Sequence, residues 1–339
     1  MERMVDRVIA SVARRYTQSR IPSVTVVLLA EARSRAAREV RARHAARAAE
    51  LAARMDAGDR DAAVAYGELA ERALADMRRE VQRQARSLGM PEHLAALAHD
   101  RFGDTRESEY LDDPSLDREL RVKLLSTLDS LNSMLGTYDA FLRAMQPLLE
   151  PGRPVRVLDL AAGHGGFAVA ATRIARRRGL PIEVTATDIK PEYLAIGEAV
   201  AAREGLPVRF AVQDALDLSN VPRGEYDVVM CTQSLHHFSA SMIARMFREA
   251  ASVAGTGVLF IDGCRSVMHG LLVPVLGALR YRDRYFAHDA WVSFRRFFAP
   301  EELGLIAGLG PEGDVSGTLE AKWMRPAHCL LRWRKGRRT

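Results

Sequence analysis

A run of small residues after an apolar stretch is the part of the sequence best suited to hold a charged ligand. The stretch Val155–Leu160 contains Asp159 and leads into Ala161-Ala-Gly163-His-Gly165-Gly. Small residues let a backbone approach a ligand closely, and a helix that begins after them offers unpaired N–H groups. Gly163 and Gly165 also fit the G-x-G-x-x-G/A pattern of dinucleotide sites, although that pattern alone is weak evidence. Because a carboxylate would repel a pyrophosphate, Asp159 favours a ligand with a positive charge, such as an α-ammonium or a sulfonium group.

Two further acidic residues follow the next two β-branched runs. Asp188 follows Ile182–Thr187, where a carboxylate can accept hydrogen bonds from both hydroxyls of a ribose. Asp214 follows Val208–Val212, where a side chain can bind the exocyclic amine of adenine. Each acid alone is more often a helix cap or a solvated loop residue. Acids after three successive runs, beside a glycine-containing turn, indicate a binding site.

These residues belong to a region in which strand-like and helix-like patterns alternate. The expected strands are Val155–Leu160, Ile182–Thr187, Val208–Val212, Tyr226–Cys231 and Gly257–Asp262, and the expected helices are Phe167–Arg178, Glu192–Glu204, Ala240–Ala254 and Pro300–Leu309. Repeated βα units predict an α/β fold with a parallel sheet and helices on both faces. Ligands of such sheets bind beyond the carboxyl ends of the strands, which is where the acids are expected.

Two segments of this region carry a resemblance to one enzyme family. The stretch from Asp159 to Gly165 is similar to a D/E-x-G-x-G-x-G loop, with Ala161 in place of the first glycine. The segment Asp227–Phe238 is similar to the segment that follows the fourth strand in that family. Residues 155–262 thereby resemble a class I S-adenosylmethionine-dependent methyltransferase domain, in particular the small-molecule enzymes of the ubiquinone/menaquinone-biosynthesis type.

The resemblance implies a Rossmann-like, mostly parallel seven-stranded sheet and S-adenosylmethionine as cofactor. Ser316–Leu319 and Ala327–Trp333 would supply the last two strands, the final one antiparallel. Asp188 matches the family's ribose-binding acid and Asp214 its adenine-binding acid. The residues expected to bind the cofactor are Asp159, Ala161, Gly163, Gly165, Asp188, Ile189, Asp214, Ala215 and Cys231.

Histidines supply the candidate catalytic groups. His236 and His237 stand where the resemblance places the transferable methyl opposite its acceptor. A hydroxyl acceptor must lose a proton, and a histidine that titrates near pH 7 suits that role. The alternative is that either one caps the next helix or packs under the cofactor. His288 and Asp289 form a second candidate pair for the base.

A long segment, residues 265–299, follows the fifth expected strand. It contains the apolar run Met268–Leu279 and then an aromatic-rich stretch up to Trp291. A helical insertion of this composition would act as a lid over the acceptor pocket and suit a hydrophobic acceptor. The alternative is a helix that packs on the domain and contacts a membrane surface.

Residues 1–110 are expected to form a helical region ahead of the methyltransferase domain, residues 111–339. A helix over Ser23–Met55 is followed by Asp59, a plausible cap for a second helix with an apolar seam from Leu74 to Leu88. Packing of this hairpin on the main domain is the simpler interpretation, and dimerisation through the seam or a lid role is the alternative. A polar linker and two leucine-rich helices are expected next, over 100–114, Leu116–Leu135 and Tyr138–Leu149.

Composition and charge limit the remaining options. The net charge of +6 comes from the two ends, because residues 101–321 contain more acidic than basic residues. This distribution argues against a nucleic-acid channel in the middle of the chain, and we interpret the basic cluster Arg334–Arg338 as a solvated tail. The three cysteines are far apart, without metal-ligand spacing, so no metal site is expected. Met1–Arg20 has no continuous apolar core, so a cytoplasmic protein is expected.

The sequence therefore predicts an enzyme that transfers a methyl group from S-adenosylmethionine to a small hydrophobic or aromatic acceptor, preferably at oxygen. The acceptor would enter between residues 265–299 and the N-terminal helices. A nucleic-acid methyltransferase that uses the basic tail is one alternative, although Cys231-Thr-Gln-Ser stands where an N/D-P-P-Y/F/W motif would be expected. A non-catalytic cofactor-binding or assembly protein is another. An NAD-dependent dehydrogenase is disfavoured by Asp159.

Overall fold

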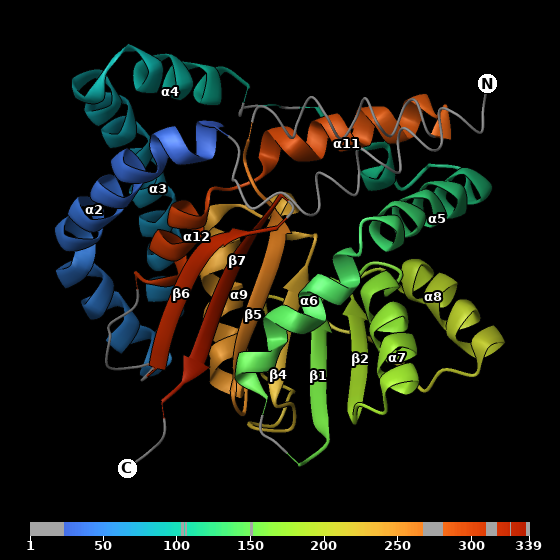
Figure 1. Ribbon diagram of the computed structural model, residues 1–339. Helices are drawn as coiled ribbons and strands as arrows, with labels where there is room; N and C mark the ends of the chain where they lie inside the picture. The colour runs from blue at the N-terminus through green and yellow to red at the C-terminus, as the bar shows by residue number, and fades with distance from the viewer. Residues whose placement is uncertain are drawn as a thin grey trace.

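The computed structural model describes residues 24–102, 105, 107–149, 152–266, 281–309, 317–325 and 327–336. A seven-stranded sheet of order β3-β2-β1-β4-β5-β7-β6 forms its centre (Figure 1). The strands are β1 Val155–Leu160, β2 Ile182–Asp188, β3 Arg209–Val212, β4 Val228–Thr232, β5 Gly257–Gly263, β6 Gly317–Met324 and β7 His328–Lys335. The first five pair in parallel, and β7 runs antiparallel to both β5 and β6. The expected fold class and the antiparallel last strand are confirmed.

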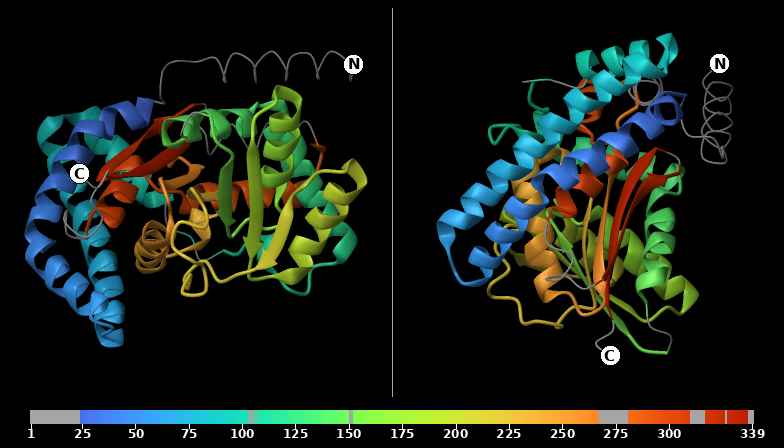
Figure 2. Two further views of the ribbon diagram at one scale, coloured as in Figure 1. Left: turned by 90° about the horizontal axis from the view of Figure 1, so that it is seen from below. Right: turned by 90° about the vertical axis from the view of Figure 1, so that its left-hand side faces the viewer.

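Helices cover both faces of this sheet. The α-helices are α2 Val24–Asp56, α3 Arg60–Leu88, α4 Met90–Phe102, α5 Arg118–Met134, α6 Thr137–Met145, α7 Gly166–Arg178, α8 Pro191–Glu204, α9 Ala240–Val253, α11 Arg284–Arg296 and α12 Pro300–Ala307. Short 3-10 turns in the described residues are η1 Tyr110–Asp112, η2 Gln146–Leu148 and η3 Leu235–His237. Helices α6, α7 and α8 lie on one face, and α9, α12 and α3 lie on the other (Figures 1 and 2). Among the described residues, no helix combines the length and apolar character needed to cross a membrane.

Alternating side chains of the central strands divide the core into two halves. Val157 and Met230 pack with Phe141 and Phe167 on the side of α6 and α7. Leu158 and its neighbours on the opposite face pack with α9, α12 and the α2–α3 hairpin. Because both faces are covered, β4 is buried throughout and β1 is buried except at Arg156, which fits the mostly apolar sequences of these strands.

The α2–α3 hairpin packs against the rest of the chain. Asp59 caps α3 as expected, since its Oδ1 accepts hydrogen bonds from the N–H groups of Asp61 and Ala62 at 3.0 and 3.1 Å. Met77 is 1% exposed and belongs to the same core cluster as Phe247 of α9. Leu74 and Met77 of the apolar seam are therefore buried within the chain, as the simpler interpretation expects, whereas Leu88 at its end is 38% exposed. Dimerisation through these helices stays a prediction.

Helices α5 and α11 lie together above the carboxyl ends of the central strands (Figure 1). The leucine stripe of α5, which includes Leu124 and Leu131, packs against Phe286 of α11. Asp283 caps α11 by accepting hydrogen bonds from the backbone N–H groups of the helix's first turn. The expected apolar run Met268–Leu279 lies outside the described residues. Of the expected lid, the structure thus describes α11 and the residues next to it.

Candidate active site

A cavity of about 580 Å³ lies between the carboxyl ends of the strands and the roof formed by α5 and α11. Its apolar wall consists of Leu124, Leu125, Leu128, Leu131, Leu135, Phe286, Phe294 and Phe297. Its floor is formed by the residues that follow β1, β2, β3 and β4, where the sequence places the candidate site. In the part of the chain that the structure describes, no residue of α2, α3 or α4 lines this cavity. On this side η1 and α5 line the cavity, and the acceptor entrance expected beside the N-terminal helices stays a prediction.

The loop after β1 has a left-handed backbone at three positions. Ala161, Gly163 and Gly165 have φ values of +49°, +57° and +72°. The family's first glycine position therefore does require a positive φ, and Ala161 adopts it at a cost of about 1–2 kcal/mol. Its carbonyl accepts a hydrogen bond from the Ser234 hydroxyl at 2.7 Å, which ties this loop to the loop after β4.

The two glycines of this loop have different surroundings. A Cβ added at Gly163 would meet nothing within 4 Å, and Gly163 lines the cavity. A Cβ added at Gly165 would lie 2.8 Å from Cε1 of Phe210 and 3.2 Å from Cβ of Ala186. Gly165 therefore lets the loop pack closely on the sheet, whereas Gly163 leaves open space for a ligand.

Asp188 fixes this loop from the end of β2. Its Oδ2 accepts a hydrogen bond from the N–H of Gly163 at 2.8 Å, and its Oδ1 accepts one from the N–H of Lys190 at 2.9 Å. Asp188 and Ile189 both line the cavity. Since each carboxylate oxygen can accept two hydrogen bonds, both oxygens retain one acceptor position for a ligand.

Asp159 is a buried carboxyl group beneath the loop. It is 1% exposed, does not line the cavity, and within the described residues neither of its oxygens has a hydrogen-bond partner. Burial, together with the charge of Asp188, raises the pKa of this carboxyl well above its usual value. A cation bound nearby would offset that cost. This orphaned carboxyl and the open space at Gly163 fit the cationic cofactor that the resemblance implies.

The other predicted cofactor residues lie at the rim or in the core. Asp214 is exposed at the cavity rim, and its Oδ1 accepts a hydrogen bond from the N–H of Leu216 at 2.8 Å. Ala215 is buried and lines the cavity beside it. Cys231 is buried in β4 and does not line the cavity. Burial raises the pKa of its thiol well above the usual value, which makes Cys231 unreactive.

Polar contacts that the sequence analysis missed join α5 and α6 to the floor. The side-chain amides of Asn132 and Gln233 exchange hydrogen bonds at 3.0 and 3.1 Å. The Tyr138 hydroxyl donates to Oδ1 of Asp129 at 2.6 Å, and Oδ2 of Asp129 lies 2.8 Å from Nε2 of His164. These contacts fix the roof over the glycine loop.

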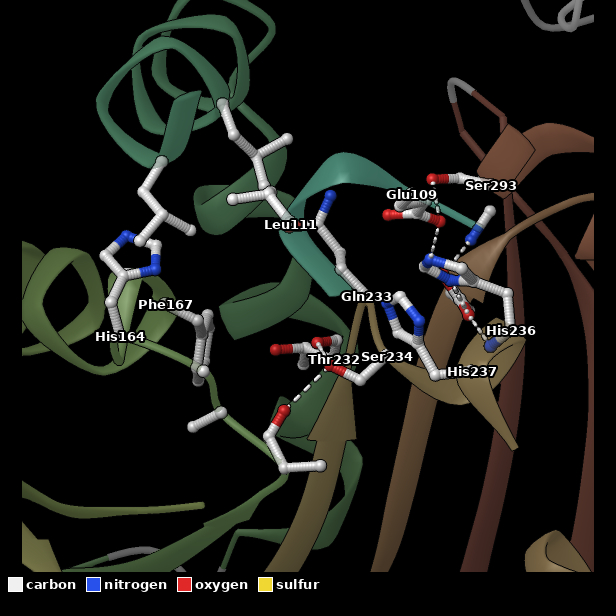
Figure 3. Close-up of a pocket in the computed structure, with 18 of the residues that line it drawn as sticks. Glu109, Leu111, His164, Phe167, Thr232, Gln233, Ser234, His236, His237 and Ser293 are labelled. Carbon is white, nitrogen blue, oxygen red and sulfur yellow. Dashed lines mark hydrogen bonds and ion pairs between the residues drawn. The ribbon is translucent and has the colours of Figure 1, made fainter. Parts of the chain in front are cut away.

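His236 lies on the opposite side of the pocket from His164, between two carboxylates (Figure 3). Its Nδ1 is 2.8 Å from Oδ2 of Asp262, and its Nε2 is 3.4 Å from Oε1 of Glu109. Burial alone would lower the pKa of His236, but the charges and hydrogen bonds of Asp262 and Glu109 raise it to about 10. These two carboxylates therefore favour the protonated form of His236, and its role as a base stays a prediction.

His237 lies next to His236 at the cavity, with 4.2 Å between the ring centroids. Its Nδ1 is 3.4 Å from Oδ1 of Asp112. Burial would raise the pKa of Asp112, but the hydrogen bond and charge of His237 and the charge of Arg296 lower it to about 2. Asp112 is thus an ionised partner of His237 across a broad pH range.

The third candidate, His288, does not line the cavity. Its Nδ1 lies 3.2 Å from Oδ1 of Asp289, and its ring packs on Tyr110. The Asp289 carboxylate accepts hydrogen bonds from the N–H groups of Tyr110 and Leu111 at 2.7 and 3.2 Å. These contacts connect α11 to η1, while Asp289, unlike His288, lines the cavity.

Glu109 and Asp112 are cavity residues that the sequence analysis did not identify. Both belong to the stretch interpreted as a linker, whose polar composition also fits a solvated loop. The Ser293 hydroxyl of α11 donates to Oε1 of Glu109 at 2.7 Å. The residues that contact these two acids lie far along the chain, so no local sequence pattern indicated their role.

Comparison with known proteins gives the family. Residues 157–257 match the model of a methyltransferase domain. A ubiquinone biosynthesis O-methyltransferase of Xanthomonas axonopodis pv. citri is 30% identical over 188 residues, which cover 54% of this chain and 74% of that relative. A ribosomal protein L11 methyltransferase of Geobacter sulfurreducens is 30% identical over 143 residues, covering 42% of this chain and 43% of that protein.

Solved structures with a related arrangement include two methyltransferases. A SAM-dependent methyltransferase from Aquifex aeolicus is 14% identical, with a TM-score of 0.41, and covers 58% of this chain and 89% of its own. Magnesium protoporphyrin IX methyltransferase from Synechocystis PCC 6803, with bound SAH, is 17% identical and has a TM-score of 0.41. The match covers 71% of this chain and 99% of that enzyme.

The sequence relatives and the residues of the glycine loop indicate the same family. The 30% identity to the Xanthomonas enzyme extends over about three quarters of that protein, so it is not limited to the glycine loop. The matched family model covers residues 157–257, which include the glycine loop, the acids after β2 and β3, and both histidines of η3. The chain therefore belongs to the class I S-adenosylmethionine-dependent methyltransferases, and it is an enzyme that uses S-adenosylmethionine as its methyl donor.

Proposed function

We propose that this enzyme methylates an oxygen atom of a small hydrophobic or aromatic acceptor. The observation that carries the proposal is the cavity itself. A wall of leucine and phenylalanine side chains faces the glycine loop, and a group of ionisable side chains lies at one end. Such a pocket suits a mostly apolar molecule that presents one polar group to a fixed position. The O-methyltransferase activity in the name of the Xanthomonas relative supports the choice of oxygen.

We assign the cofactor to the floor of the cavity. Asp188 would bind the ribose hydroxyls with its remaining acceptor positions, and Asp214 would bind the adenine amine at the rim. The buried carboxyl group of Asp159 would favour the positively charged end of the cofactor, because a nearby cation favours its ionised form. Gly163 contributes open space rather than a contact. The cofactor supplies a methyl group on a positively charged sulfur atom, which is already a good leaving group.

The protein's own contribution is then mainly to position the acceptor and to exclude water. Side chains of α5 and α11 form the apolar wall. The hydrogen-bonded amides of Asn132 and Gln233 hold α5 to the floor of the cavity. Alignment of the reacting atoms can supply much of the rate acceleration for such a displacement. A hydroxyl acceptor must also lose its proton. We assign this step to the polar end of the cavity, where Glu109, His236 and His237 meet.

A labelling experiment tests the proposal. The enzyme is incubated with methyl-labelled S-adenosylmethionine and a cell extract that is afterwards separated into small molecules, protein and nucleic acid. We expect the label in the organic-soluble small-molecule fraction, as a base-stable ether identified by mass spectrometry. Label that enters nucleic acid or protein, with none in small molecules, would refute the proposal. Calorimetry with S-adenosylmethionine on the same sample verifies that the enzyme is active in cofactor binding.

A further inference from the structure

We propose that Glu109, His236 and His237 form a binding site for one divalent first-row transition-metal ion at the polar end of the cavity. One ligand atom from each of these three side chains lies within 4.8 Å of the other two. Two imidazole nitrogens and one carboxylate oxygen suit Zn²⁺, Mn²⁺, Fe²⁺ or Co²⁺, whereas Mg²⁺ and Ca²⁺ prefer oxygen ligands. The site is distinct from the cofactor residues on the floor.

The spacing of the atoms fits a shared ion. Nε2 of His236 and Oε1 of Glu109 are 3.4 Å apart, which is long for a charge-assisted hydrogen bond. Two ligands bound at about 2.1 Å in a tetrahedral arrangement are separated by about 3.4 Å. The observed distance therefore leaves room for an ion bound to both atoms without movement of either side chain.

The orientation of His236 is fixed by a carboxylate behind it. Oδ2 of Asp262 lies 2.8 Å from both Nδ1 and the backbone nitrogen of His236, which leaves Nε2 directed at Glu109 (Figure 3). A carboxylate that holds the far nitrogen of a histidine is the usual second partner at metal sites. The Ser293 hydroxyl holds Glu109 in the same way, by donating to Oε1 at 2.7 Å.

Burial and charge also favour a cation. The side chains of Glu109, His236 and Asp262 are 6%, 6% and 3% exposed, and Asp112 brings a third carboxylate beside His237. Three carboxylates therefore lie beside two imidazoles, and an ion with two positive charges would offset the excess negative charge, above all at the enclosed pair of Glu109 and His236. Arg296 lies 3.5 Å from Asp112, and it also donates a hydrogen bond to the backbone carbonyl of Glu107.

The free coordination positions would face the acceptor. His237 is the most exposed of the three ligands, with 32% of its side chain accessible, and all three line the cavity. Three protein ligands leave positions open for an oxygen atom from the ligand in the cavity. If our proposed function holds, that oxygen belongs to the acceptor, and its coordination would lower the pKa of the acceptor hydroxyl. This use of the ion, unlike its binding, depends on the proposed function.

Metal binding can be measured without any methyl acceptor. Untagged full-length protein is stripped with a chelator, dialysed, and titrated with Zn²⁺, Mn²⁺ and Co²⁺ by calorimetry, with the bound metal counted by mass spectrometry. We expect one equivalent of at least one ion. Glu109→Gln, His236→Gln and His237→Gln should each weaken binding by about 100-fold or more. The Co²⁺ complex should show visible absorption bands that change in each variant.

A histidine–carboxylate pair elsewhere provides the matched control. His44 of α2 lies 2.9 Å from Oδ2 of Asp76, outside the proposed site, so His44→Gln should bind metal like the unmodified protein. Binding of S-adenosylmethionine and a cooperative thermal transition verify that each variant is folded. If His236→Gln does not fold, the more exposed His237→Gln decides the matter.

Two results would overturn the proposal. One is the absence of stoichiometric binding for all three ions, and the other is binding that remains unchanged in the folded site variants. Either would leave the cluster as a buried ion pair of His236 with Glu109 and Asp262. Stoichiometric metal binding in a protein that methylates no small molecule would support the metal site while refuting the proposed function, so the two ideas fail separately.

Discussion

At the scale of single residues, the two glycines of the loop after β1 have different roles: one leaves space for a ligand and the other allows close packing on the sheet. Gly163 and Gly165 both have a positive φ, but only Gly163 borders the cavity. Asp188 holds the loop by accepting the hydrogen bond of the Gly163 N–H, so the space above the loop is defined before any ligand enters. Such preorganisation lowers the cost of ordering the site during binding.

Substitutions of the two glycines should therefore differ in their effects on stability and on cofactor binding. Gly163→Ala adds a methyl group in open space, so we expect a loss of about 1–2 kcal/mol in stability from the positive φ. The same methyl occupies ligand space, so the affinity for S-adenosylmethionine should fall about tenfold or more. Gly165→Ala should cost more stability, about 3 kcal/mol, because its Cβ would overlap Phe210. Denaturant melts and calorimetry distinguish the two, and equal stability losses would contradict this assignment.

Asp159→Asn should affect stability and binding in opposite directions. Burial and the charge of Asp188 raise the pKa of Asp159, so the carboxylate form costs stability in the ligand-free protein. A group whose pKa is raised on folding contributes stability at low pH and loses it as the pH rises. The ligand-free variant should therefore melt at the same or a higher temperature than the unmodified protein at neutral pH, by a margin that grows with pH. Its affinity for S-adenosylmethionine should nevertheless fall, and a variant with unchanged affinity would show that Asp159 does not sense the cofactor's charge.

At the scale of elements, α5 contributes more to the site than its sequence suggests. Its leucines read as an ordinary amphipathic stripe, which predicts burial but not the partner. In the structure that stripe contacts α11 and also forms the apolar wall of the cavity. The roof thus uses one helix from before β1 and one from between β5 and β6, and neither belongs to the segment matched by the family model.

A bulky residue in this wall should block the acceptor and spare the cofactor. Leu128 of α5 lines the cavity, so Leu128→Trp should lower kcat/KM for the acceptor by about tenfold or more, while the affinity for S-adenosylmethionine changes little. Leu94→Trp in α4 is the matched control, because Leu94 is 56% exposed and lies outside the cavity lining. Steady-state kinetics with the acceptor found by labelling give kcat/KM, and calorimetry gives the affinity for S-adenosylmethionine. An unaltered kcat/KM in Leu128→Trp would place the acceptor elsewhere.

The success of sequence reasoning differed between elements for a physical reason. The strands and the acids that follow them were predicted because β-branched runs and strand-end positions are local signals, as at Asp188 and Asp214. Glu109 was missed because its role depends on His236 and Ser293, which are distant in the sequence. The base role expected for His236 depends on its neighbours for the same reason. Only the folded structure places two carboxylates beside its ring.

At the scale of the whole molecule, the α2–α3 hairpin and the sheet share one core. Tyr66 and Met77 of α3 belong to the same buried cluster as Phe247 of α9 and Phe260 of β5. The hairpin approaches α9 closely, since a Cβ added at Gly67 would lie 2.1 Å from Oγ of Ser241. Elements that share a close-packed core are expected to unfold together. The domain boundary predicted near residue 110 would then be a feature of the sequence only, because the residues on its two sides would unfold in one cooperative transition.

Met77→Ala tests this coupling. Met77 is 1% exposed, so the substitution should cost about 2–4 kcal/mol through lost burial and the cavity left behind. All three tryptophans, Trp291, Trp323 and Trp333, lie outside the hairpin, so their fluorescence reports on the rest of the molecule. If the core is shared, Met77→Ala should lower the denaturant midpoint equally by tryptophan fluorescence and by far-ultraviolet circular dichroism. A helical transition that shifts alone, with the fluorescence midpoint unchanged, would instead show that residues before 110 fold as a separate domain.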